Sequence, residues 1–183
     1  MALGYSPGLP WPTSQTNHNG AAVTLLSYDA LGRVVREVRG AAASDAFTSL
    51  ATNRFAYSPA GDLVGFTDAL NHSTTWQYDA AGRVLKKLNT AGQLVWTNAY
   101  DALNRVTAHW TPARSNVTRY SYDAAGRLIL VDFSNPGTTD LRFGYDNAGR
   151  LTVMADATGS TRFTWNALGL LEAEDGPWAD DTV

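Results

Sequence analysis

Residues 122–128 read YDAAGRL, and close variants of this seven-residue phrase recur along the chain. The other copies are YDALGRV at 28–34, YDAAGRV at 78–84, YDALNRV at 100–106 and YDNAGRL at 145–151. Aligning the chain on the leading aromatic residue gives seven anchors, at Tyr28, Tyr57, Tyr78, Tyr100, Tyr122, Tyr145 and Trp165. Apart from a longer first gap, successive anchors are almost evenly spaced. Such a regular period predicts an array of one supersecondary unit.

The phrase itself predicts a β-hairpin. Asp is favoured at the first position of a type I turn and Gly at the fourth. A type I turn followed by a left-handed residue forms a three-residue hairpin loop with a bulge, and Gly or Asn adopts that conformation most easily. The predicted structural turn residues are therefore Asp29 and Gly32, Asp79 and Gly82, Asp101 and Asn104, Asp123 and Gly126, and Asp146 and Gly149.

The hairpin predicts a register. If Asp79 and Arg83 flank the loop, Tyr78 faces Val84 across the hairpin, as a favourable aromatic–aliphatic pair. The same arithmetic pairs Tyr28 with Val34, Tyr122 with Leu128, and Tyr145 with Leu151. We expect the Asp–Arg pair on the opposite, more solvated face, where it guides the register more than it stabilises.

A second turn falls midway in most repeats, so turns recur at short, regular intervals, as in an antiparallel meander. We expect roughly fourteen strands between Val23 and Glu174, and the alanine-rich residues 40–46 are the only place where a helical turn is considered. Alternation predicts one apolar face, which carries Tyr28, Trp76, Tyr78, Tyr100, Tyr122, Tyr145 and Trp165. The expected domains are an irregular segment over 1–22, the β array over 23–175 and an acidic tail over 176–183.

The predicted fold class is all-β, an antiparallel meander of hairpins in a strongly curled sheet. Strand twist accumulates, so sheets beyond about ten strands usually curl. No helices are expected to cover the apolar face. We therefore expect a segment of a curved shell wall, a barrel-like closure or a rolled sandwich.

The repeated phrase and its even period resemble the YD repeats of the Rhs family. That family includes bacterial Rhs polymorphic toxins, the B and C subunits of insecticidal toxin complexes, and the teneurins. The resemblance implies a long sheet that spirals into a hollow shell, which encloses a C-terminal toxin in the bacterial members. It also implies a secreted or cell-surface location. The expected function is thus a non-catalytic scaffold, whose partners are neighbouring repeats or further copies through open sheet edges.

The chain departs from the resembled family in length and at one motif. Family shells contain dozens of repeats, against the seven anchors here. The family's core commonly ends in a DPxGL-type motif where self-cleavage uses aspartates. The best match here is Asn-Ala-Leu-Gly-Leu at 166–170, with Asn in place of the Asp and Ala in place of the Pro. We therefore expect neither self-cleavage nor an enclosed toxin domain.

Composition excludes several other classes. Apolar residues make up 44% and charged residues 17%, typical of an ordered globular protein. The net charge of −3 comes with scattered Lys and Arg, so no nucleic-acid partner is expected. No apolar run is long enough to predict membrane insertion, and the absence of cysteine excludes disulfides and cysteine-ligated zinc.

The residues offer little for catalysis or cofactors. The three histidines, His18, His72 and His109, lack paired metal spacing. No nucleophile–base motif or nucleotide fingerprint occurs, so the chain is predicted not to be an enzyme and to hold no metal or cofactor. One alternative function stays open. Exposed aromatics, namely Trp96, Trp110 and Tyr120, would serve a carbohydrate or cell-surface binding module, because a ring stacks on the apolar face of a sugar.

Overall fold

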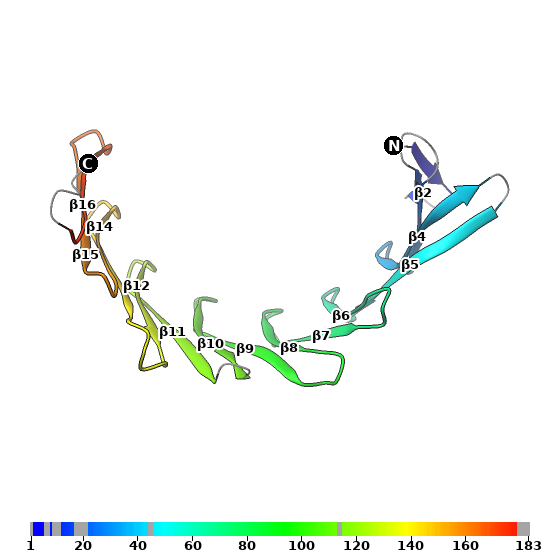
Figure 1. The fold of residues 1–183 in the computed structure, drawn as a ribbon, viewed down its shortest axis with the longest axis horizontal. Helices are drawn as coiled ribbons and strands as arrows, with labels where there is room; N and C mark the ends of the chain where they lie inside the picture. The colour runs from blue at the N-terminus through cyan, green and yellow to red at the C-terminus, as the bar shows by residue number, and fades with distance from the viewer. Residues whose placement is uncertain are drawn as a thin grey trace. The chain divides into compact units, whose positions relative to one another are not determined.

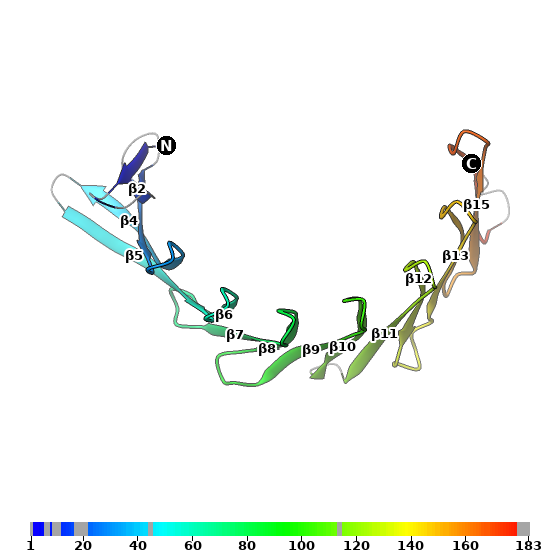
Figure 2. The same cartoon turned by 180° about the vertical axis from the view of Figure 1, so that it is seen from behind.

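The computed structural model describes residues 2–5, 8, 12–16, 22–43, 46–112 and 115–178. The chain divides into two compact units, Met1–Val95 and Trp96–Val183. Each unit is built from antiparallel strands that pair with their neighbours in the chain (Figures 1 and 2).

The first unit begins with two short strands and continues with six hairpin strands. Its strands are β1 (Ala2–Tyr5), β2 (Pro12–Thr16), β3 (Ala22–Tyr28), β4 (Val34–Ala43), β5 (Ala46–Tyr57), β6 (Leu63–Thr67), β7 (Ser73–Tyr78) and β8 (Val84–Leu88). The pair β4–β5 is the longest, and its register runs from Arg36 opposite Arg54 to Ala43 opposite Ala46.

The second unit repeats the same pattern. It contains β9 (Leu94–Tyr100) from Trp96 onward, then β10 (Val106–Thr111), β11 (Asn116–Tyr122), β12 (Leu128–Phe133), β13 (Leu141–Tyr145), β14 (Leu151–Ala155), β15 (Ser160–Trp165) and β16 (Leu171–Asp175). Fourteen of the described strands lie between Ala22 and Asp175, in agreement with the expected number.

The predicted hairpin register is confirmed. Tyr78 lies opposite Val84, and the three other predicted pairs form, Tyr28 with Val34, Tyr122 with Leu128 and Tyr145 with Leu151. The register shifts by one residue immediately before each of these pairs. This shift is the bulge that a type I turn with a left-handed last residue imposes.

The prediction of strong curling and closure is wrong. The described strands follow one another in chain order, and no pairing joins the first of them to the last, so the sheet is an open meander and not a barrel. No second layer of described residues covers either face: Val38 and Val131 are the buried apolar residues of the described chain. The aromatic rings of the expected apolar face are half-buried. Tyr122, Tyr145 and Trp165 contact the arginine of the preceding hairpin and not an opposing layer.

Two local expectations also differ from the structure. The alanine-rich residues considered for a helical turn are extended, since β4 runs to Ala43 and β5 begins at Ala46. The segment expected to be irregular contains the paired strands β1 and β2. Pro12 is the first residue of β2 and pairs at a bulge with Tyr5, which is a position where a strand tolerates a missing N–H.

Candidate functional site: the turns and the links between repeats

One carboxylate organises each regular turn. In the turn at 123–127, Asp123 Oδ1 accepts the backbone N–H of Ala125 and of Arg127, both at 2.9 Å. Its second oxygen, Oδ2, accepts the Arg127 Nε–H at 2.7 Å. Gly126 closes the turn by donating its N–H to the Asp123 carbonyl at 3.0 Å, with φ at 83°.

The same geometry recurs in the other copies. The residue at the Gly position has a positive φ in each, which confirms the predicted left-handed position: 77° at Gly32, 76° at Gly82, 64° at Asn104 and 85° at Gly149. Because backbone N–H groups point at the carboxylate, each turn Asp has a lowered pKa. The largest cause is the hydrogen bond from the backbone of the fifth turn residue, Arg33 for Asp29 and Arg127 for Asp123. These carboxylates are therefore structural acceptors.

The anchor ring links a repeat to the one before it at Tyr57, Tyr78, Tyr122, Tyr145 and Trp165. The Tyr145 hydroxyl donates to the Leu128 carbonyl at 2.9 Å, and the Tyr122 hydroxyl to the Val106 carbonyl at 2.8 Å. The variant anchor Trp165 keeps the link, since its Nε1–H donates to the Leu151 carbonyl at 2.7 Å. In the first unit, equivalent bonds run from Tyr57 to Val34 and from Tyr78 to Leu63.

The turn arginine forms a second link, in the forward direction. The Arg127 guanidinium carbon lies 4.8 Å from the centroid of the Tyr145 ring, and its Nη1 donates to the Asp146 carbonyl at 2.9 Å. Arg150 lies over Trp165 at 5.7 Å and Arg33 over Tyr57 at 4.7 Å. A cation over an aromatic face is attractive by about 0.5–1 kcal/mol at exposed sites.

This arginine corrects the expectation that the Asp–Arg pair sits on the opposite, wetter face. The Arg127 side chain is 31% exposed, because it is held between its own Asp123 and the next anchor ring. Sequence reasoning missed the contact because it joins residues of two successive hairpins. A signal was present in the joint recurrence of Arg and aromatic in the regular repeats.

Two turns depart from the phrase while keeping its shape. In the turn at 58–62, Ser58 replaces Asp and Asp62 replaces Arg; the Ser58 Oγ–H donates to Asp62 Oδ2 at 2.9 Å, and Gly61 has φ of 103°. In the turn at 166–170, Asn166 Oδ1 accepts the N–H of Leu168 and Leu170 at 2.9 and 3.0 Å. Neither turn carries an arginine at its fifth position.

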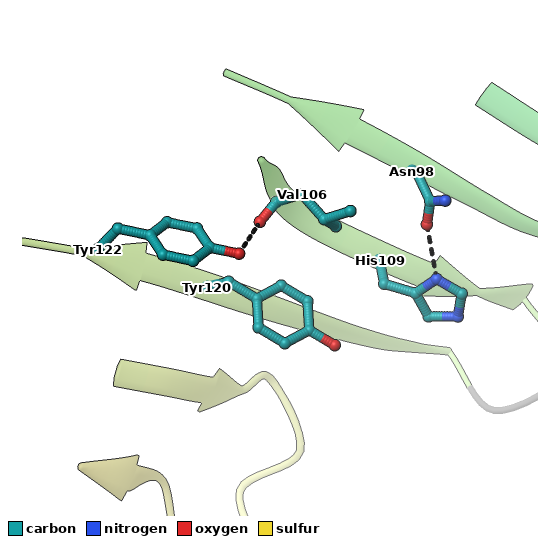
Figure 3. Close-up of a pocket in the computed structure, with 5 residues that line it drawn as sticks. All are labelled: Asn98, Val106, His109, Tyr120 and Tyr122. Atoms are coloured by element: carbon teal, nitrogen blue, oxygen red, sulfur yellow. Dashed lines mark hydrogen bonds between the residues drawn. The ribbon is translucent and has the colours of Figure 1, made fainter. Parts of the chain in front are cut away.

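A cavity in the second unit brings together part of the proposed sugar-binding set. It has a volume of about 320 Å³ and is lined by Asn98, Val106, His109, Tyr120 and Tyr122 (Figure 3). The His109 Nδ1 is 2.7 Å from Asn98 Oδ1. Its Nε2 is 3.3 Å from Thr111 Oγ1. The ring of Trp96 lies 5.7 Å from that of His109.

The remaining candidates do not join this cavity. Trp110 follows His109 in β10 and so points to the other face, where it is 38% exposed. His72 pairs with Asp68 at 3.1 Å, and His18 lies outside the described residues. Among the residues the structure describes, no three His, Asp or Glu side chains gather as a metal site would require. The described part of the chain also has no helix long and apolar enough to cross a membrane.

Consecutive hairpins joined by ring and arginine links define a β-hairpin repeat protein. Residues 57–94 and 100–134 match the RHS Repeat family. Over 114 residues, 61% of the chain, the sequence is 32% identical to Double-stranded DNA deaminase toxin A of Burkholderia cenocepacia, of which the match covers 7%.

The fold is similar to that of two solved structures, the crystal structure of TcdB2-TccC3 and the Photorhabdus luminescens Tc holotoxin pore. In each comparison the TM-score is 0.70 at 20% identity, over 84% of this chain and 9% of the other. At this identity the likeness shows the fold alone. The chain spans less than a tenth of the length of these relatives.

Proposed function

We propose that this chain is a non-catalytic segment of a shell wall, a strip of RHS repeats whose work is structural. The observation that carries the proposal is the pair of links between successive repeats. Five anchor rings bond backward to the carbonyl after the previous turn, those of Tyr57, Tyr78, Tyr122, Tyr145 and Trp165. Turn arginines reach forward to the next ring, as Arg127 does to Tyr145. Such links hold hairpin to hairpin along a strip without needing a second layer.

The exposure of the sheet supports a place within a larger assembly. Apolar residues make up 44% of the chain, yet Val38 and Val131 are the buried apolar residues of its described part. Leu3 and Tyr5 on the terminal strand β1 are 49% and 58% exposed, and Leu171 on the other terminal strand, β16, is 49% exposed. Terminal strands of an open sheet offer unpaired backbone groups to further strands. Neighbouring repeats, in a longer array or another copy, are the partners we propose.

Sedimentation velocity of the full chain over a hundred-fold range of concentration tests the wall proposal. We expect association through the terminal strands. Leu3→Lys places a charge on the edge strand β1 and should reduce association. Leu70→Lys is the matched control, because Leu70 is 75% exposed on a turn away from the terminal strands. A protein that stays monomeric, and whose anchor residues exchange their amide hydrogens without protection, would contradict the proposal.

The non-catalytic part has its own test. The turn carboxylates are occupied by backbone N–H groups, and their pKa values are lowered, which suits acceptors and not general acids. We expect the intact mass of the purified protein to stay constant on prolonged incubation. A cut near Leu170 that disappears on mutation of a nearby Asp would show self-cleavage.

A second candidate function, carbohydrate or cell-surface binding, is favoured by the cavity at His109. Its walls combine the Tyr120 ring with the polar groups of Asn98 and His109, a pairing that suits a sugar. Screening the chain against a glycan array tests this function. Binding that is lost in Tyr120→Ala and retained in Trp110→Ala would establish it, and an array without signal would exclude it.

A further inference from the structure

Tyr78 differs from the anchors that carry a guanidinium. In the first unit the ring of Tyr57 lies under Arg33, and in the second unit Tyr122, Tyr145 and Trp165 lie under the arginine of the preceding turn. Tyr78 follows the divergent turn at 58–62, where Asp62 stands in the arginine's position. Within the described residues, no guanidinium lies over the Tyr78 ring. Its hydroxyl link is intact, at 2.8 Å from the Leu63 carbonyl.

The Asp62 carboxylate approaches the glycine of the next turn, as the guanidinium does in other repeats. A Cβ built on Gly149 would lie 3.9 Å from Arg127 Nη1. A Cβ built on Gly82 would lie 3.9 Å from Asp62 Oδ1. At this glycine a carboxylate oxygen thus takes the place of a guanidinium nitrogen. Ser58 is the side-chain partner of Asp62 and donates to Oδ2 at 2.9 Å.

A cavity lies beside the Asp62 carboxylate and the Tyr78 ring. Its volume is about 610 Å³, and its walls include Ser58, Asp62, Trp76, Tyr78 and Asp79. Asp79 already forms an ion pair with Arg83 at 2.7 Å. Asp62 has Ser58 as its side-chain partner and forms no ion pair with any cation of the described residues, so it supplies the unpaired negative charge of the cavity. An aromatic face and a carboxylate on one cavity form a site for a flat cation.

The regular repeats show which cation this geometry accepts. There the guanidinium stacks on the ring and also donates to the carbonyl of the next turn, as Arg127 does to Asp146 at 2.9 Å. At the divergent turn the equivalent carbonyl is that of Asp79, which accepts the Gly82 N–H at 3.1 Å and has a second lone pair. An ammonium group is a compact point charge, so it would match the ring and the carbonyl together less well than a planar guanidinium does.

We propose that the cavity between the turn at 58–62 and Tyr78 binds an arginine side chain supplied by a partner polypeptide. The incoming guanidinium pairs with Asp62, stacks on Tyr78 and donates to the Asp79 carbonyl. The partner's arginine thereby forms the link that other repeats form with an arginine of their own chain. The proposal is independent of the shell-wall function, since it rests on the divergence of one turn from its sister turns.

Nuclear magnetic resonance of the full chain tests this site with a blocked Gly-Arg-Gly peptide as the probe. We expect saturable shifts in the ring resonances of Tyr78 and Trp76, and none at Tyr145, whose ring is already under Arg127. The same peptide with citrulline, which is uncharged, should produce no shift. The lysine peptide should bind about threefold more weakly, because its ammonium stacks less well.

Two variants of Asp62 and one control complete the test. Asp62→Asn should weaken the arginine peptide about fivefold, since the ion pair is lost. Asp62→Arg should abolish the response by placing a guanidinium over Tyr78 in cis, and should raise the thermal midpoint. Glu172→Arg makes the same charge change on the exposed strand β16 and should leave the response unchanged. A Tyr78 that does not respond, or an equal response to citrulline or in Asp62→Asn, would overturn the proposal.

Discussion

The turn at 123–127 and the turn at 58–62 have the same shape, yet they connect to their neighbours differently. Both close with a glycine of positive φ, 83° at Gly126 and 103° at Gly61. In both, the side chain at the first turn position accepts a hydrogen bond from the backbone N–H of the fifth residue. The acceptor is Asp123 in the regular turn and Ser58 in the divergent one. The regular turn sends Arg127 forward to the Tyr145 ring, whereas the divergent turn presents Asp62.

The comparison separates two roles that the repeated phrase combines. The turn conformation depends on the glycine and on any short acceptor at the first position, which is why Asn166 also supports it. The forward link needs in addition an arginine at the fifth position, which contacts the next anchor ring. The backward link depends on the anchor ring and persists in both regions, as the hydroxyls of Tyr145 and Tyr78 show.

The largest effect is expected at the shared glycine. Gly126→Val should lower the free energy of unfolding by about 1–3 kcal/mol, because a β-branched residue is strained at positive φ. Gly61→Val should lower the free energy of unfolding by a similar amount if the two turns share their shape. Gly137→Val is the control, since Gly137 is an exposed loop glycine that is not among those with positive φ. Urea denaturation measures all three, and equal values for Gly126 and Gly137 would contradict the conformational argument.

The arginine should distinguish the two turns. Arg127→Ala removes the contact with the Tyr145 ring and the hydrogen bond to Asp146, and should destabilise by about 1–2 kcal/mol. Asp62→Ala, at the same position of the divergent turn, should have a smaller effect, because no forward link is lost. Arg162→Ala, on an exposed residue of β15, controls for the loss of a surface charge. A loss in Asp62→Ala as large as in Arg127→Ala would refute the distinction.

The hydroxyl link should affect both regions alike. Tyr145→Phe and Tyr78→Phe each remove one hydrogen bond to a carbonyl, and each should lower the unfolding free energy by about 0.5–1.5 kcal/mol. Tyr120→Phe is the matched control, because the Tyr120 hydroxyl lines a cavity and has no assigned partner among the described residues. If Tyr120→Phe matches the other two in urea denaturation, the link does not stabilise the strip.

The smallest effect is expected from pH. The regular turn carboxylates have lowered pKa values, so the folded chain binds fewer protons than the unfolded chain, whose Asp pKa is about 3.9. Their stabilisation is therefore complete above that value and is lost as pH falls through the folded pKa. Asp123→Asn should flatten this acid dependence while retaining the turn, as Asn166 does. An unchanged slope between pH 5 and pH 2 would count against this account.

Local regularities were predictable because they lie within a few residues of the chain. The turn type, the left-handed glycine and the pairing of Tyr78 with Val84 all follow from the positions of Asp, Gly and the anchor within one phrase. The strands β1 and β2 were missed because the prolines at 7, 10 and 12 suggested an irregular segment, yet Pro12 is accommodated at a strand start.

The sequence alone determined the hairpin, its register and the repeat, since each depends on short-range sterics and alternation. Only the tertiary structure showed that the sheet stays open and that Arg127 covers the Tyr145 ring. The alternation of apolar and polar residues along a strand predicts an apolar face but not what covers it. Cover by a second layer and cover by a neighbouring hairpin both require the same alternation. The absence of an arginine over the Tyr78 ring, among the described residues, was recognised only by comparison with the anchor rings that an arginine covers.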